Sequence, residues 1–99
     1  MKFEDERIDC TFEVPDKPTV RWQMQFKSIL LENQKKELYE RLWPCVCLLA
    51  ENWKSEVVPE LNVDILDECT DPEAASVIEW ASLQLYVYYL ELENVPKNE

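Results

Sequence analysis

The longest regular pattern of hydrophobic and polar positions in this chain runs from Thr70 to Glu93. Apolar residues recur there at the three- and four-residue spacing of a helix face, at Ile78, Ala81, Leu85, Tyr88 and Leu92. Further apolar residues fill the neighbouring surface, namely Val77, Trp80, Leu83, Val87 and Leu90. The polar positions form only a narrow stripe, through Glu79, Ser82, Tyr86 and Glu93. We therefore expect a long central helix that is buried on most sides or has partners on more than one side.

The start of this helix is marked by three consecutive residues. Asp71 offers a side-chain cap, Pro72 suits the first helical position, and Glu73 places an acid in the first turn. The pattern ends after Leu92, where a polar tail containing Pro96 follows. Residues 94–99 are expected to form a flexible end.

The N-terminal part of the chain alternates between apolar and polar positions. Apolar residues at Ile8, Cys10, Phe12 and Val14 predict a strand with one apolar face, which stops at Pro15. Residues 1–7 are highly charged and are expected to be frayed.

Residues 19–32 allow two interpretations. Alternation from Val20 to Phe26 would make a second strand and a hairpin, whereas Trp22, Phe26 and Ile29 also fit one face of a helix that Thr19 could cap. We favour the helix, because a strand ending at Phe26 leaves the following apolar residues without a partner element.

The middle of the chain predicts helix from about residue 33 to residue 57. Pro44 interrupts the pattern, so the chain either kinks after Trp43 or begins a new helix with Pro44 in its first turn. Residues 60–71 are an acidic connection, which we expect Val63, Ile65 and Leu66 to hold against the body. The expected fold is a single domain over residues 1–99, mainly α within the α+β class, with a short N-terminal strand or hairpin and a long C-terminal helix.

Composition removes several classes of function. The chain of 99 residues is 46% hydrophobic with four tryptophans, which is enough to build a core, and it contains no histidine and no glycine. The missing histidine excludes imidazole-based catalysis, and the missing glycine excludes the phosphate-binding loops of nucleotide-binding proteins. We expect no enzyme activity and no cofactor.

The four cysteines do not form a metal-binding pattern. A single residue separates Cys45 from Cys47, so in the expected helix their side chains point in different directions. No two cysteines have the two-residue spacing of a zinc knuckle. The acids around Asp64 and Asp71 lack the glycine that a calcium loop uses for its turn. Free thiols fit a reducing compartment, and no apolar run is long enough for a signal peptide or a membrane span, so we expect a cytoplasmic protein without membrane contact.

The charge is strongly asymmetric. Of the 21 acids, eleven lie in residues 55–99 beside the single base Lys97, and the net charge of the whole chain is −11. Such a surface attracts basic partners and repels nucleic acid, so we expect no direct nucleic-acid binding. The candidate partner-binding residues are the acids and tyrosines of this half, namely Glu60, Asp64, Asp67, Glu68, Tyr86 and Tyr89.

Two stretches carry a resemblance to a known class of proteins. The segments EVPDKPTVRW, residues 13–22, and VIEWASLQLYVYYLELENVPKN, residues 77–98, resemble the small acidic proteins encoded in bacteriophage and prophage tail modules. The resemblance implies an assembly or structural accessory protein, located in the bacterial host cytoplasm or in the virion. It contains no catalytic signature, and no functional residues are carried over from it.

Two functions from different classes follow. The first is a non-enzymatic acidic module that binds a protein partner, or a second copy of the chain, through an apolar flank of the central helix. The second is an inhibitor that mimics nucleic acid, with carboxylates in place of phosphates, and blocks a basic DNA- or RNA-binding protein. Salt separates the two, because carboxylate mimicry depends strongly on ionic strength and an apolar interface does not.

Overall fold

The computed structural model describes residues 1–93 and shows a mixed α+β domain. Three strands, β1 (Lys2–Asp5), β2 (Ile8–Glu13) and β3 (Glu51–Lys54), form an antiparallel sheet with β2 in the centre. The helices are α1 (Val20–Glu32), α2 (Leu38–Leu49), the short α3 (Ile65–Glu68) and α4 (Pro72–Glu93). No helix within the described residues is long and apolar enough to cross a membrane.

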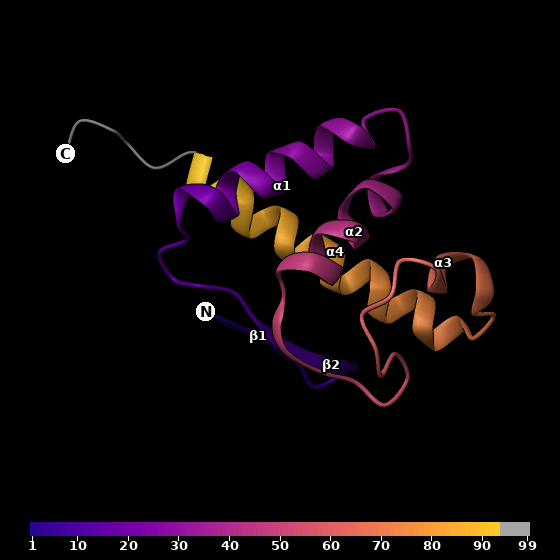
Figure 1. The fold of residues 1–99 in the computed structure, drawn as a ribbon. Coiled ribbons are helices and arrows are strands. Elements are labelled where there is room, and N and C mark those ends of the chain that lie inside the picture. Colours follow the sequence, from indigo (N-terminus) through magenta and orange to yellow (C-terminus); the bar gives the residue numbers. More distant parts are fainter. Residues whose placement is uncertain (94–99) are drawn as a thin grey trace.

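The long helix α4 crosses the whole domain, with α1 and α2 on one side and the sheet on the other (Figure 1). Its buried residues follow the predicted spacing, at Ala74, Val77, Ile78, Ala81, Ser82, Leu85 and Tyr88. Asp71 receives a hydrogen bond from the amide of Glu73 at its Oδ1 atom, over 2.9 Å, as expected of a residue that precedes a helix. The prediction of a long C-terminal helix is confirmed.

Aromatic side chains connect the sheet to α4. Phe12 of β2 is fully buried, and its ring lies 5.0 Å from Phe3, 5.7 Å from Trp53 and 5.8 Å from Trp80, measured between ring centroids. These three neighbours come from β1, β3 and α4, so a single ring contacts every strand partner and the central helix. Trp43 of α2 contacts Trp53 from the other side, at 5.7 Å.

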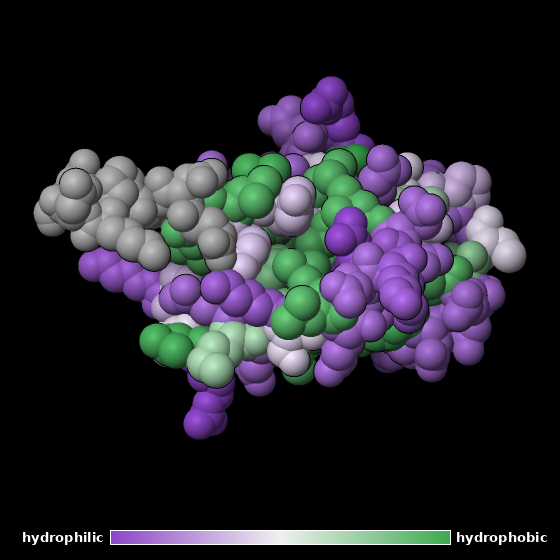
Figure 2. Space-filling view, turned by 90° about the horizontal axis from the view of Figure 1, so that it is seen from above, coloured by the Kyte–Doolittle hydropathy of each residue, from purple (hydrophilic) through white to green (hydrophobic). Residues whose placement is uncertain are grey.

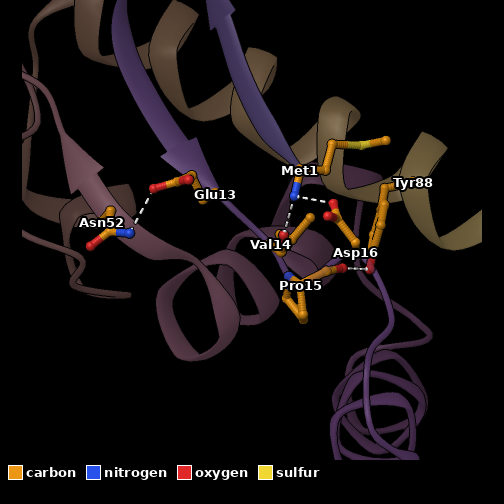
Figure 3. A network of polar contacts seen from close by, with 7 residues as sticks. All are labelled: Met1, Glu13, Val14, Pro15, Asp16, Asn52 and Tyr88. Carbon is orange, nitrogen blue, oxygen red and sulfur yellow. Dashed lines mark hydrogen bonds and ion pairs between the residues drawn. The ribbon is translucent and has the colours of Figure 1, made fainter.

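The segment between β2 and α1 is also held by polar contacts (Figure 3). The ammonium group of Met1 donates hydrogen bonds to the carbonyl of Val14 at 2.7 Å and to Oδ1 of Asp16 at 2.6 Å, and this hydrogen bond lowers the pKa of Asp16. The hydroxyl of Tyr88, on α4, donates to the carbonyl of Pro15. The chain therefore leaves the sheet along α4 before it enters α1.

The preferred interpretation of residues 19–32 is confirmed. The chain is helical from Val20 to Glu32, and Oγ1 of Thr19 accepts a hydrogen bond from the amide of Trp22 over 3.1 Å. On this helix, Trp22 and Phe26 turn inward and stack at 5.7 Å.

Several predictions for the rest of the chain were wrong. The domain is mixed and not mainly α, because residues 1–7, expected to be frayed, contain β1, and residues 51–54, expected to be helical, form β3. Both strands are four residues long and gain their stability by pairing with β2, which a local pattern does not reveal. The flexible end expected for residues 94–99 lies outside the described residues.

No new helix begins at Pro44. Helix α2 runs from Leu38 to Leu49 with Pro44 inside it, and it begins five residues later than predicted. Within β3, Asn52 has a φ of 52°, in the left-handed region, at the place where the pairing of β2 with β3 shifts register. Asparagine tolerates this region better than most residues, and this chain has no glycine to use there. The side chain of Asn52 also donates to Oε2 of Glu13 at 2.6 Å (Figure 3).

The polar stripe predicted for α4 was only partly correct, because Glu79 is exposed and Tyr86 is half-buried, whereas Ser82 is buried. Ser82 is 1% exposed, whereas Leu83 is 41% exposed and Val87 is 51% exposed. Because apolar residues surround most of this helix, its pattern does not say which of two apolar faces meets the core. The core lies on the face of Leu85, and an apolar row that includes Leu83, Val87 and Leu90 meets solvent.

We predict that two identical substitutions on α4 have very different effects. Leu85→Ala should lower the free energy of unfolding by about 2–5 kcal/mol, because the side chain is fully buried and its removal leaves a cavity. Leu90→Ala removes the same atoms from an exposed position and should change it by about 0.5 kcal/mol or less. Denaturant melts measure both, and equal effects would contradict the assignment of the buried face.

Candidate functional site

An apolar hollow lies where α2, α3 and α4 meet. It has a volume of about 530 Å³. Its walls come from the first turns of α2, from α3 and the residues that follow it, and from the first three turns of α4. We call it the α2–α3–α4 pocket; its lining residues are Leu38, Tyr39, Leu42, Ile65, Leu66, Cys69, Asp71, Ala74, Ala75, Ile78, Glu79, Ser82 and Leu83.

Small residues on α4 explain why the pocket is hollow. Ala74, Ala75 and Ser82 lie on the side of α4 that faces this space, opposite Leu38 and Leu42 of α2. A pair of helices with large residues at these positions would fill the gap between them, whereas side chains this short leave it open. The pocket is thus a consequence of residue size at three positions of the central helix.

The segment before α4 forms the third wall and is anchored at one point. Nε1 of Trp43 donates a hydrogen bond to the carbonyl of Asn62 at 3.0 Å, and Oδ1 of Asn62 accepts from the amide of Asp64 at 2.9 Å. Ile65 and Leu66 are half-buried, as expected of residues that hold this segment against the body. Both also line the pocket. Val63, which was also expected to hold this segment against the body, is 44% exposed.

Acidic side chains border this apolar space. Asp71 and Glu79 line it, none of the lining residues is basic, and neither acid forms an ion pair within the described part of the chain. Asp67 and Glu68 of α3 are exposed directly after Leu66. An apolar hollow whose charged lining residues are both acids favours an occupant that is apolar in the middle and positive at its edges.

The hydroxyl of Ser82 is a buried polar group without a hydrogen-bond partner in residues 1–93. Its Oγ atom has almost no contact with solvent, and the side chain lies in the wall of the pocket. An unsatisfied buried hydroxyl costs roughly 1–3 kcal/mol. At this position the small size of serine matters more to the structure than its polarity.

The six predicted partner-binding residues fall into two groups. Glu60, Asp64, Asp67 and Glu68 are all exposed in one segment, and the last two flank the pocket. Tyr86 is half-buried one turn beyond Ser82. Tyr89 instead stacks on Phe26 of α1, with ring centroids 4.3 Å apart and planes 12° apart, so its ring serves the fold.

Sequence reasoning missed the residues that α2 contributes. Leu38, Tyr39 and Leu42 line the pocket, and Tyr39 is 46% exposed. They are separated from Leu66 by more than twenty residues, so no local pattern connects them. The one sequence feature that could have indicated a binding role was Tyr39, a large aromatic residue among charged neighbours at the start of an expected helix.

Exposed apolar side chains are not confined to the pocket. Val20, Met24 and Leu31 of α1 are 71%, 64% and 67% exposed. Seen from the α1 side, hydrophobic side chains gather in the middle of the surface between hydrophilic ones (Figure 2). The domain therefore has apolar surface on more than one face.

The thiols differ in their environments. Cys10 and Cys45 are buried and Cys47 is half-buried, and burial raises the pKa of each to about 12. Cys69 is exposed in the pocket wall. Within residues 1–93, no three Cys, Asp or Glu side chains are grouped so that they could hold a metal ion.

We predict that one thiol per chain reacts rapidly in the native protein. At pH 8 a thiol with a pKa near 12 is about one part in ten thousand thiolate, so Cys10, Cys45 and Cys47 should react slowly. A neutral reagent such as dithiodipyridine should give one fast thiol, identified as Cys69 by mass spectrometry, and all four in concentrated guanidinium. Two or more fast native thiols would contradict the burial described.

We also predict that Ser82→Ala raises the free energy of unfolding by about 1 kcal/mol, because the unfolded chain hydrates a hydroxyl that the folded chain leaves unsatisfied. Denaturant melts at constant pH measure the change. Ser76→Ala is the control, since Ser76 is exposed on the same helix. A loss of stability in Ser82→Ala, beyond that of the control, would show that the Ser82 hydroxyl has a partner.

Comparison of this chain with protein-family models, with curated proteins and with solved structures finds no match.

Proposed function

We propose that this chain is a non-enzymatic protein-interaction module that binds a basic protein partner. The observation that carries the proposal is the α2–α3–α4 pocket, an apolar hollow whose lining contains two acids and no base. Apolar surface supplies affinity in protein interfaces, and charge at the edge supplies orientation and a faster encounter.

Two features argue against catalysis. The chain has no histidine, and burial raises the pKa of three of its four thiols to about 12, whereas a nucleophilic cysteine needs a lowered pKa. The lining of the pocket contains no cationic side chain that could stabilise an anion. Binding is the function that this set of residues supports.

The biological setting we propose is assembly. The resemblance of residues 13–22 and 77–98 to small acidic proteins of phage and prophage tail modules suggests an accessory or structural role in building a larger particle. A basic partner in the bacterial cytoplasm or in the virion fits such a role. The exposed apolar residues of α1 and α4 would then supply additional contacts within an assembly.

The alternative is a mimic of nucleic acid, and the four exposed acids between Glu60 and Glu68 favour it. Two arrangements count against it. Leu61, Ile65 and Leu66 interrupt these acids and are half-buried, so the segment alternates between packing and solvation. Asp67 and Glu68 also adjoin an apolar hollow, where a phosphate-like row would present carboxylates alone.

We predict that changing four acids to amides slows binding without abolishing it. The variant carries Glu60→Gln, Asp64→Asn, Asp67→Asn and Glu68→Gln, all at exposed positions, so its fold should be unchanged. The association rate with the partner captured from the source cells should fall about tenfold or more, and the dissociation rate should change less than about threefold, because charge acts mainly on encounter. Surface plasmon resonance at low and high salt measures both rates.

The matched control changes four exposed acids outside this half, namely Glu4→Gln, Glu6→Gln, Glu32→Gln and Glu51→Gln, and it should leave both rates within about twofold. Loss of all binding in the first variant, together with loss of wild-type binding at moderate salt, would support the mimic. Capture of no partner at either salt concentration would contradict the proposed function itself.

A further inference from the structure

We infer that the α2–α3–α4 pocket receives apolar side chains from a partner segment that carries Lys or Arg on both sides of them. This inference rests on the proposed function and names the chemistry of the partner at that site. Its first support is size. A volume of about 530 Å³ lies in the range of roughly 300–1,000 Å³ found for binding sites, so the pocket can hold more than one large side chain.

The second support is the lining. Leu42 and Ile78 are buried at the base of the walls, Leu66 is half-buried, and Leu83 is 41% exposed. The hydroxyl of Ser82 has almost no contact with solvent, so an occupant meets apolar atoms over most of its surface. Leu, Met or Phe side chains match this lining, and a charged side chain inside it would lose its hydration without gaining a partner.

The third support is charge complementarity. Asp71 and Glu79 lie in the wall, and Asp67 and Glu68 adjoin it, while residues 55–93 contain no base. A partner residue next to the buried apolar side chains on the α3 and α4 side of the pocket therefore meets carboxylates. A cation there is attracted, and an anion is repelled.

The same charges argue against a second copy of this chain as the occupant. Each copy has a net charge of −11, and its own apolar row of Leu83, Val87 and Leu90 is flanked by Glu79 and Glu91 on the same helix. Inserting that row into the pocket would place acids against acids. The partner that fits is a different protein with a basic segment.

The test uses short synthetic peptides and the full chain. The probe is the capped peptide KKLFKK, with KKAAKK and EELFEE as controls for the apolar and the basic residues. Binding is read in two ways: by shifts of the backbone amide signals of Ala75, Ile78 and Leu83 in ¹H–¹⁵N spectra, and by the rate at which iodoacetamide modifies Cys69. Cys69 lines the pocket, so an occupant shields it.

Two pairs of variants locate the binding. Ala75→Phe places a ring in the pocket from an exposed position, and Ser76→Phe puts the same ring on the neighbouring exposed residue outside the lining. Glu79→Lys reverses a charge in the wall, and Glu91→Lys reverses one on the same helix away from it. All four positions are exposed, and thermal melts should show the fold intact.

We expect KKLFKK to slow the modification of Cys69 at least fivefold and to shift the three amide signals, and KKAAKK and EELFEE to do neither. Ala75→Phe should abolish the effect, Glu79→Lys should weaken peptide binding at least fivefold, and the two control variants should stay within twofold of the original chain. Equal binding of KKAAKK would show that charge alone acts, and equal binding of EELFEE would show that the acids play no part. Either result would overturn the inference.

The failure of this inference is distinguishable from the failure of the proposed function. If the partner captured from the source cells binds Ala75→Phe as tightly as the original chain, the pocket is not its site, although the chain is an interaction module. A dimer that Ala75→Phe disrupts would assign the pocket to a second copy and would also overturn the inference. Binding of the peptide without capture of any protein would support the pocket and contradict the proposed function.

Discussion

The packing of Phe12 against its aromatic neighbours is the interaction on which the rest of this structure depends. Its ring contacts Phe3 of β1, Trp53 of β3 and Trp80 of α4, and none of it is exposed. A small three-stranded sheet has little stability alone, and it becomes stable when its apolar face is covered. Here the cover is α4, and Phe12 determines which face of that helix is used.

The position of the pocket follows from this choice. Once Trp80 and Tyr88 of α4 face the rings of the sheet and of α1, the side with Ala75, Glu79 and Leu83 is left outside the core. Helix α2 packs on α4, and α3 lines the hollow that is left where the three helices meet. The arrangement that stabilises the fold therefore also creates the surface that we propose for binding.

The sequence predicts best those elements that are determined by residues close together in the chain. The helix of residues 20–32 was predictable, because Thr19 caps it and the positions of Trp22 and Phe26 determine its buried face. The strand of residues 8–13 was predictable from its alternation. In contrast, β1 and β3 have four residues each and form by pairing with β2, and in β3 only Trp53 is half-buried.

The candidate site was predictable only in part, for the same reason. The acids of residues 60–68 were found because charge is visible in composition, and they do lie at the surface beside an apolar region. The apolar pocket combines residues of α2, α3 and α4 that lie far apart in the sequence, and their proximity depends on how the three helices pack. The stacking of Tyr89 on Phe26 could not be predicted from a local pattern, because the two residues are more than sixty positions apart.

Native-state hydrogen exchange tests most directly the claim that β2 and α4 form one cooperative unit through Phe12. We expect the amides of β2 and of residues 77–88 to exchange only by global unfolding, with the free energy obtained from denaturant melts, and residues 60–68 to exchange by local opening. Exchange of β2 at a clearly lower free energy than α4 would show that the sheet opens separately, and would contradict this account.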